Sequence, residues 1–180
     1  SLLAEKKEGM TRLEIIEKGK LDDNGALSEI LKELEWCGFI RGYSMLGKQV
    51  KDEIFQLIDH YTLFYYEFIQ GKRHGKNFWQ AMEGKPRYNS WCGRAFERTC
   101  LWHIDQIKQK LGISGVLTNE YAWRYNPKNN PSATASEGVQ IDLLIDRSDG
   151  IIDLCEIKYS NYKFTITEAY QEKLSRRKSI

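Results

Sequence analysis

The chain has 180 residues, of which 41% are hydrophobic and 29% are charged, and its formal net charge is +2. This length suffices for one domain or two small ones with apolar cores, and the charge excludes a strongly polycationic chain. No stretch approaches the roughly 20 apolar residues of a membrane-spanning helix, so we predict no membrane association.

Cysteine usage and the first residues indicate a cytoplasmic protein. The 4 cysteines lack C-x-x-C spacing and do not cluster with the 3 histidines. Reduced, buried cysteines are the default for such a protein, and zinc is not expected. The first residues lack the basic and apolar regions of a signal peptide. They resemble the interior of a helix without a start, so we expect the chain to be a fragment of a longer protein.

Residues 1–76 are predicted to form a winged helix-turn-helix-like domain with a linking helix. Thr11-Arg12-Leu13-Glu14 has the capping-box pattern and opens a short helix that ends near Gly19. A second helix is expected over residues 26–37, followed by a hairpin with strands at 39–44 and 53–57 around a turn at 46–48. Helices followed by a hairpin are the order of a winged helix.

The helix at 26–37 carries Glu29, Glu33 and Glu35 against a single Lys32. Because a negative helix repels phosphates, we expect this domain to dock protein rather than DNA. Residues 59–69 form an aromatic-rich helix, for which packing is favoured over base stacking. A basic, glycine-flanked linker at 71–76 then leads to the second domain, residues 77–180.

The second domain is predicted to open with a helix over residues 91–111, capped by Asn89 or Ser90 and ended by Gly112. Glu97 lies within the inward stripe of this helix, where an aliphatic residue is expected. It is either a partner for a neighbouring arginine or a carboxylate aimed at a site. A strand at 115–124 and a polar loop at 125–138 follow.

The most informative segment is a predicted β-hairpin whose apolar runs flank Ser148-Asp149-Gly150. If these residues form the loop with Gly150 left-handed, Arg147 lies opposite Ile151. That register places Asp142 opposite Glu156. It also places Gln140 opposite Lys158, so the four polar side chains share one face. The alternating apolar residues pack the other face: Val139, Ile141, Leu143, Ile145, Ile151, Cys155 and Ile157.

This polar group suits a hard divalent cation, because Mg²⁺ prefers carboxylates, waters and substrate phosphate as ligands. Asp142 and Glu156 would supply the carboxylates, and the Ile157 carbonyl could add a third oxygen. Lys158 would orient or help deprotonate a water. The implied chemistry is metal-assisted attack of water on a phosphodiester. The alternative is a buried, purely structural ion pair of Lys158 with Glu156 or Asp142, in which the two charges only compensate each other.

A helix rich in Lys and Arg at its end is predicted over residues 165–179. The complete order is a helix with Glu97, a strand, a strand with Asp142, a strand with Glu156-x-Lys158, and a helix. It resembles the core of PD-(D/E)xK nuclease-like domains, in which Gln140 would match an accessory polar position. Ile141 stands where the motif name has proline. The predicted fold class is therefore α/β, or α+β overall, with a restriction-endonuclease-like αβββα core.

More narrowly, several segments look like the C-terminal region of archaeal and bacterial AAA-type ATPases. In those proteins a winged helix and a nuclease-like domain follow the ATPase module. The segments are Phe96-Glu97, Leu101 to Ile107, Leu111 to Gly115, Gln140 to Asp146 and Cys155 to Lys158. At least one more strand follows in the resembled family, so we expect the core to be C-terminally incomplete, with an open sheet edge.

The resemblance implies that Asp142, Glu156 and Glu97 hold Mg²⁺ or Mn²⁺. It further implies that Lys158 positions the nucleophile and Gln140 contacts phosphate or water. The parent protein would bind ATP through its N-terminal AAA module, since no G-x-x-x-x-G-K-[ST] occurs here. DNA is the predicted partner, through basic residues such as Lys85, Arg87, Arg94, Arg124, Lys128 and Lys163. The alternative is a catalytically silent DNA-docking or protein-interaction module that regulates the ATPase.

Overall fold

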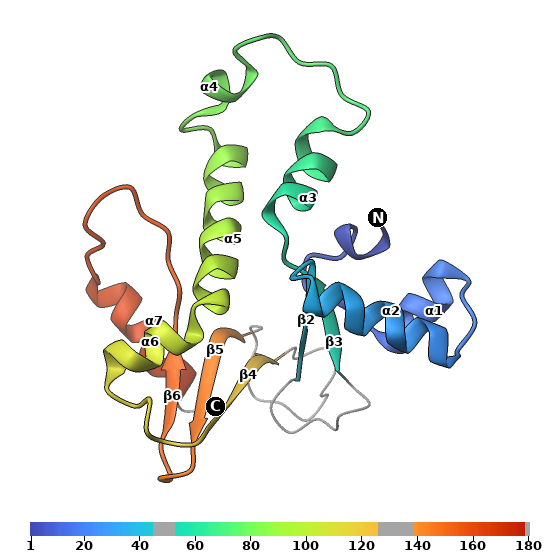
Figure 1. Cartoon of the computed structure of the whole chain (residues 1–180). Coiled ribbons are helices and arrows are strands. Elements are labelled where there is room, and N and C mark those ends of the chain that lie inside the picture. Colours follow the sequence, from blue (N-terminus) through green and yellow to red (C-terminus); the bar gives the residue numbers. More distant parts are fainter. Residues whose placement is uncertain (45–52, 126–138, 179–180) are drawn as a thin grey trace. The chain divides into compact units, whose positions relative to one another are not determined.

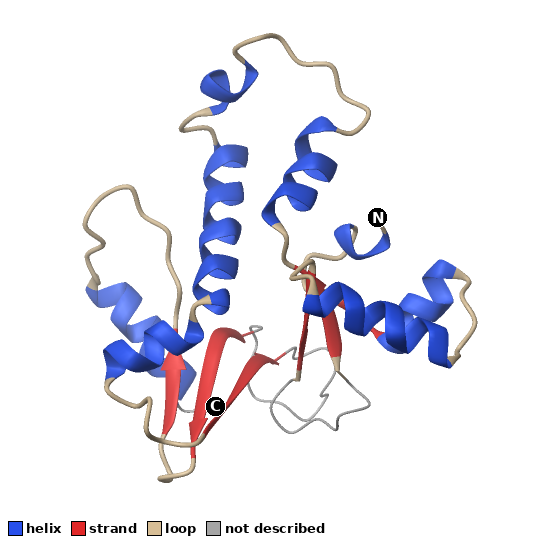
Figure 2. Cartoon of the chain, viewed as in Figure 1, coloured by secondary structure: helices blue, strands red, loops and turns tan. Residues whose placement is uncertain are grey.

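The computed structural model of the chain describes residues 1–44, 53–125 and 139–178. The chain divides into two compact units, Ser1–Tyr88 and Asn89–Ile180. Each unit combines helices with a three-stranded antiparallel sheet, so the fold is mixed α/β (Figures 1 and 2). The predicted division of the chain lay after Lys76, and the structural one lies after Tyr88.

The first unit matches the predicted order of helices and strands. Its sheet has the order β1-β3-β2, and both strand pairs are antiparallel. The two-residue strand β1 was not predicted, because so short a segment carries no periodic pattern. The predicted turn at 46–48 lies outside the described residues. The elements are the 3-10 helix η1 (Leu2–Ala4), β1 (Met10–Thr11), α1 (Arg12–Gly19), α2 (Gly25–Trp36), β2 (Ile40–Tyr43) and β3 (Ile54–Leu57).

Side-chain caps fix where the first two helices begin. The Thr11 hydroxyl accepts a hydrogen bond from Glu14 N, and the Glu14 carboxylate accepts one from Thr11 N at 2.9 Å, which confirms the predicted capping box. Asn24 caps α2 by accepting a hydrogen bond from Leu27 N at 3.1 Å. An N-cap of this kind typically contributes about 1 kcal/mol to stability.

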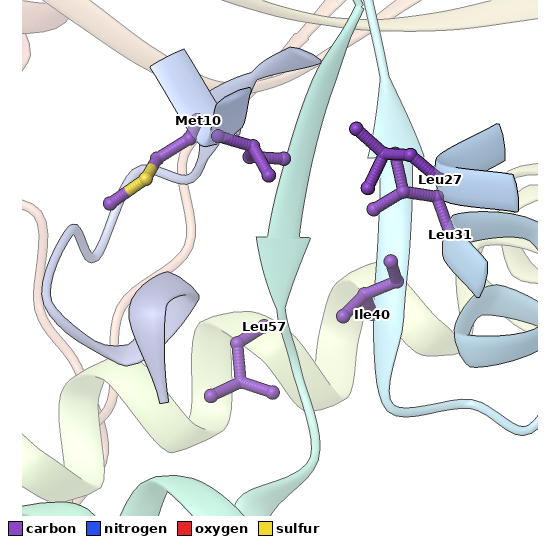
Figure 3. Packing of buried hydrophobic residues seen from close by; sticks show 6 residues of the cluster. Met10, Leu27, Leu31, Ile40 and Leu57 are labelled. Atoms are coloured by element: carbon purple, nitrogen blue, oxygen red, sulfur yellow. The ribbon is translucent and has the colours of Figure 1, made fainter. Parts of the chain in front are cut away.

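The core of the first unit draws on both helices and all three strands. Figure 3 shows Leu27 and Leu31 of α2 beside the sheet residue Ile40. Complete burial of each such side chain contributes roughly 1.5–3 kcal/mol, so apolar packing holds α2 on the sheet. The buried cluster consists of Met10, Ile15, Leu27, Leu31, Ile40 and Leu57.

Gly9 permits the close pairing of β1 with β3. Its φ is +88°, and a Cβ at this position would lie 2.6 Å from the Phe55 carbonyl oxygen and 2.8 Å from Ile54 Cγ2. β1 pairs with these same two residues, as Met10 with Phe55 and Thr11 with Ile54. A side chain at position 9 would therefore strain the backbone and force the two strands apart.

The second half of the first unit is held by aromatic rings that pack in tilted and edge-to-face arrangements. α3 (His60–Phe64) continues into the π-helix η3 (Tyr65–Ile69), and α4 (Phe78–Met82) follows. The Phe68 side chain is 1% exposed, and its ring centroid lies 5.0 Å from that of Phe64 and 5.4 Å from that of Trp79. Phe68 is therefore core, as the favoured packing role of the predicted aromatic helix requires, while Tyr61 is 71% exposed.

The second unit has the strand order β4-β5-β6, with antiparallel pairs throughout. No helix in the described parts of the chain is both long and apolar enough to cross a membrane. The predicted polar loop beyond Tyr125 lies outside the described residues. The elements are α5 (Pro86–Trp102), α6 (Ile104–Leu111), β4 (Thr118–Tyr125), β5 (Val139–Arg147), β6 (Ile152–Cys155) and α7 (Glu168–Lys178).

The single helix predicted over residues 91–111 is wrong in two respects. α5 begins at Pro86 instead of after a cap at Asn89 or Ser90, because proline is well suited to the first turn of a helix. The helix also breaks at His103, where α5 gives way to α6. The predicted end at Gly112 is confirmed, since this residue is left-handed with a φ of 73°.

The hairpin of β5 and β6 has the predicted register. Leu143 pairs with Cys155, and Asp146 pairs with Ile152. Arg147 N donates a hydrogen bond to the Ile151 carbonyl at 2.9 Å, and Gly150 is left-handed with a φ of +83°. Continued along the chain, this register places Asp142 opposite Glu156.

Two boundaries around the hairpin differ from the prediction. β6 ends at Cys155, so Glu156 and Lys158 follow the strand instead of lying within it. The helix predicted from residue 165 begins at Glu168, because the Thr167 hydroxyl accepts a hydrogen bond from Tyr170 N and so caps α7 at that point.

One face of the second sheet packs against helices. Leu143 and Ile145 of β5 are buried in one cluster with Leu101 of α5 and with Ile113, and Cys155 and Ile157 pack against it. This is the predicted apolar face, with one correction. Ile151 was expected to pack there, but it is 48% exposed, because it lies at the turn beyond the cover of the helices.

We predict that Gly9→Ala lowers the free energy of unfolding of the first unit by about 2 kcal/mol or more. The reasons are the positive φ and the contact of the new Cβ with the β3 backbone. Gly25→Ala is the matched control, because a Cβ at Gly25 would have no neighbour within 4 Å and alanine favours the helix. Urea unfolding followed by tryptophan fluorescence measures both variants. Equal stability of the two variants would contradict the role assigned to Gly9.

Candidate functional site

The polar residues of the hairpin lie on the sheet face that α5 and α6 do not cover. Leu101 of α5 and Ile104 of α6 pack with Leu143 and Ile145. Because side chains alternate along a strand, Asp142 belongs to the opposite face of β5. The hairpin register places Glu156 on that face too. The candidate site is therefore built on the far side of the sheet from the apolar core.

A backbone hydrogen bond fixes the Asp142 carboxylate. Its Oδ2 accepts a hydrogen bond from Ile157 N at 2.9 Å. Since β6 has already ended at Cys155, this contact takes the place of a further rung of the strand ladder. It holds Glu156 and Lys158, which flank Ile157 in the sequence, close to β5.

Three donors surround the Glu156 carboxylate. Lys158 Nζ lies 2.6 Å from Oε1, and the Tyr170 hydroxyl donates to the same oxygen at 3.3 Å. The Arg177 guanidinium binds the other oxygen, Oε2. The Glu156 and Arg177 side chains are only 13% and 14% exposed, while that of Lys158 is 43% exposed. Two of the three donors belong to α7, so this carboxylate attaches α7 to the hairpin.

The two carboxyl groups have pKa values shifted in opposite directions. Burial raises the pKa of Asp142, and the negative charge of Glu156 raises it further against the hydrogen bond from Ile157. Burial also acts to raise the pKa of Glu156, but the hydrogen bonds and charges of Lys158 and Arg177 outweigh it and hold that pKa below its ordinary value. Neighbouring acids with diverging pKa values are typical of functional sites, and structural ion pairs produce them too.

Lys158 is held in its charged form. Burial alone would lower the pKa of its amine, but the hydrogen bond and negative charge of Glu156 raise it, and the charge of Asp142 adds to this effect. A lysine whose pKa is raised is protonated at neutral pH, so it can donate hydrogen bonds and supply positive charge. It is less suited to take a proton from water.

The other two predicted site residues lie further along β5 and on α5. Gln140 is on β5 two residues before Asp142 and is exposed. Glu97 lies on α5, one turn before Leu101, whose side chain packs on the opposite sheet face from Asp142. The charges that act on Asp142 are those of Glu156, Lys158 and Arg177, while Glu97 acts on Cys100. Its role as a third carboxylate stays a prediction.

The donor set fits a divalent cation held by two carboxylates. Within the described ranges, no group of three or more His, Cys, Asp or Glu side chains is arranged to hold a metal. Asp142 and Glu156 nevertheless meet beside Lys158, and carboxylate oxygens are the ligands that Mg²⁺ prefers. The raised pKa of Asp142 means that its ionised form is incompletely stabilised, and a bound cation would supply the missing charge.

Tyr170 and Arg177 are site residues that the sequence reasoning missed. The predicted helix over residues 165–179, rich in Lys and Arg at its end, was given no role in the site. A signal was present, because residues seven positions apart lie on the same face of an α-helix. The hairpin register also placed the Glu156 carboxylate on the sheet, where a buried charge requires ionic or hydrogen-bond partners. Which helix face would meet the hairpin could not be read from the sequence.

The basic residues predicted to bind DNA lie in several different parts of the chain. Arg87 belongs to the first unit, where its guanidinium lies over the Phe68 ring and donates to the Glu67 carbonyl at 2.7 Å. Arg94 donates to the Ser90 hydroxyl at 2.5 Å. Lys85 and Lys163 are exposed. Lys128 and the side chain of Arg124 lie outside the described part of the chain.

Comparison with known proteins identifies no relative: no family model, curated protein or solved structure matches this chain.

We predict that Asp142→Asn and Glu156→Gln change the free energy of unfolding in opposite directions near neutral pH without divalent cations. A raised folded-state pKa means that stability is lost as the pH rises through it, so Asp142→Asn removes a destabilising charge. The amide oxygen can still accept the hydrogen bond from Ile157. A lowered folded-state pKa means that ionised Glu156 stabilises the fold, and this contribution is lost as the pH falls through it.

Urea unfolding near neutral pH and below the ordinary carboxyl range, at about pH 3, measures both effects. We expect Asp142→Asn to be more stable than wild type only at the higher pH. Glu156→Gln should be less stable there, with a smaller deficit in acid. Asp146→Asn, on the same strand and face, is the matched control. A destabilising effect of Asp142→Asn at neutral pH would contradict the assigned direction of the pKa shift.

Proposed function

We propose that the second unit is a Mg²⁺- or Mn²⁺-dependent endonuclease domain of the PD-(D/E)xK type, which hydrolyses phosphodiester bonds in DNA. The main support is the meeting of Asp142 and Glu156 on one sheet face beside Lys158. The order of elements agrees with such a core, since helices α5 and α6 precede three strands and α7 follows them.

We further propose that the first unit is a winged helix-turn-helix-like domain. Its two helices followed by the β2–β3 hairpin, with β1 paired to β3, support this assignment. Glu29 and Glu33 are exposed on α2, and Lys32 lies over the Trp36 ring at 4.8 Å. Because this acidic surface repels phosphates, the domain serves as a protein-docking or interdomain element, and DNA binds through the second unit.

In the proposed reaction, Asp142 and Glu156 are the residues that would hold the cation. When bound, the cation would stabilise charge on the phosphate and lower the pKa of water. Lys158, charged and beside Glu156, would orient the attacking water by donating a hydrogen bond and would balance negative charge on the phosphate. Gln140, exposed along β5, would contact a phosphate oxygen or water, and Glu97 would steer the cation or water.

The resemblance to AAA-type ATPases extends the proposal to a longer protein. In it, an N-terminal ATPase module outside this chain binds ATP, and the two units described here act as its C-terminal region. The N-terminal module would then be the first partner of this chain, with DNA as the second.

A second candidate function is a catalytically silent module that docks DNA or protein and regulates the ATPase. One observation favours it: both oxygens of Glu156 already have partners, as expected of a purely structural ion-pair network. Metal binding is the property that separates the two candidates, because only the nuclease requires it.

The test measures Mn²⁺ binding by calorimetry and cleavage of supercoiled plasmid with Mg²⁺ or Mn²⁺. We expect wild type to bind and to cleave. Asp142→Asn and Glu156→Gln should weaken binding by about tenfold or more and abolish cleavage. Lys158→Ala should retain binding but slow cleavage by about 100-fold, because it acts on the water. Asp146→Asn, the charge-matched control, should change neither.

Two results would count against the nuclease. Failure of wild type to bind Mn²⁺ or Mg²⁺ at millimolar concentration would overturn it. Binding without cleavage of duplex, nicked or single-stranded DNA would favour the silent docking module instead.

A further inference from the structure

Both oxygens of the Glu156 carboxylate are occupied by groups of this chain. Lys158 and Tyr170 share Oε1, and Arg177 binds Oε2. A carboxylate offers about four lone-pair sites, and these donors use three of them. A cation coordinated by Glu156 would therefore share Oε2 with the positively charged Arg177 or displace a donor, so it competes with the groups that now bind Glu156.

Arg177 is the donor best placed to leave. Lys158 lies two residues from Glu156 and is tied to it by the chain. Arg177 instead belongs to α7, which is joined to β6 by residues 156–167, a segment without helix or strand. The first residues of this segment are anchored at Ile157, but residues 158–169 are exposed, and Tyr162 reaches 87% exposure, so solvent surrounds the stretch that leads into α7.

Arg177 also carries the charge that a divalent cation would replace. Its guanidinium is 14% exposed against a carboxylate that is 13% exposed, so each neutralises the other away from water. Its positive charge also reaches Asp142, the second carboxylate of the site. A divalent cation between the two acids would supply the same compensation and would repel the guanidinium.

We propose that Arg177 is a competing counter-ion built into α7, which closes the metal site when no cation is present. In this proposal, which depends on the proposed function, cation binding displaces Arg177 from Glu156 and releases the C-terminal end of α7. Docking of α7 and binding of the metal are then mutually opposed. By linkage, whatever weakens the Arg177 contact strengthens cation binding by the same factor.

The test compares Arg177→Gln with Lys173→Gln in the full chain. Both substitutions remove one positive charge from α7, but Lys173 is exposed, so it controls for long-range charge. Calorimetric titration with MnCl₂ should show affinity raised about fivefold or more in Arg177→Gln. Lys173→Gln should stay within about twofold of wild type, as expected for an exposed charge screened by salt.

Two further measurements keep the test independent of any folding defect. Tyr170→Phe removes only the hydrogen bond to Glu156 and keeps the ring that packs on Phe164, with centroids 5.4 Å apart. It should raise affinity in the same direction but less. In wild type, Mn²⁺ should speed amide hydrogen exchange over residues 168–178, and Asp142→Asn should abolish this effect.

The outcomes separate this proposal from the nuclease proposal. Unchanged or weaker Mn²⁺ binding by Arg177→Gln, or slower exchange of α7 on adding Mn²⁺, would overturn the competition while leaving the nuclease intact. Absence of binding in wild type and in Arg177→Gln alike would overturn both.

Discussion

The second unit depends on the register between β5 and β6. Gly150 reverses the chain in a left-handed conformation, and each later pair follows from that turn. A shift by one residue would move Ile145, which has no exposed surface, out of the core and bring Asp146 into it. The same shift would separate Asp142 from Glu156. One turn therefore determines both the hydrophobic packing and the juxtaposition of the acidic groups.

Burial strengthens the electrostatic interactions among the charged side chains around Asp142 and Glu156. Asp142 and Glu156 are both partly withdrawn from water. Lys158 and Arg177 contact Glu156 directly but act on Asp142 through their charge, and the pKa values of the two acids diverge as a result. Breaking the pair of Glu156 and Arg177 would leave a poorly exposed carboxylate to Lys158 and Tyr170 alone, which is costlier than breaking a surface ion pair. A substitution that removes one member of this network around Glu156 is therefore expected to destabilise the second unit.

Sequence patterns predicted the local features well. The capping box at Thr11, the left-handed Gly150 and the hairpin register are set by neighbours close in the chain. The patterns failed where distant residues decide. The start of α5 at Pro86 is the exception, because proline is itself a local start signal, whereas the break at His103 carries no periodic signal. The contact of Arg177 with Glu156 joins two elements through a long connection, so only the three-dimensional fold reveals it.

The connection between β6 and α7 also acts as a tether with a thermodynamic consequence. A group held near its target by a short flexible linker has an effective concentration of about millimolar. The Arg177 guanidinium is tethered to Glu156 in this way, through residues 156–167 and the helix α7 that follows them. A cation from solution displaces it only when the cation's concentration and affinity together exceed the effective concentration and affinity of Arg177. Insertions into the segment would lower that threshold, whereas deletions that leave it too short to span the two elements would break the contact.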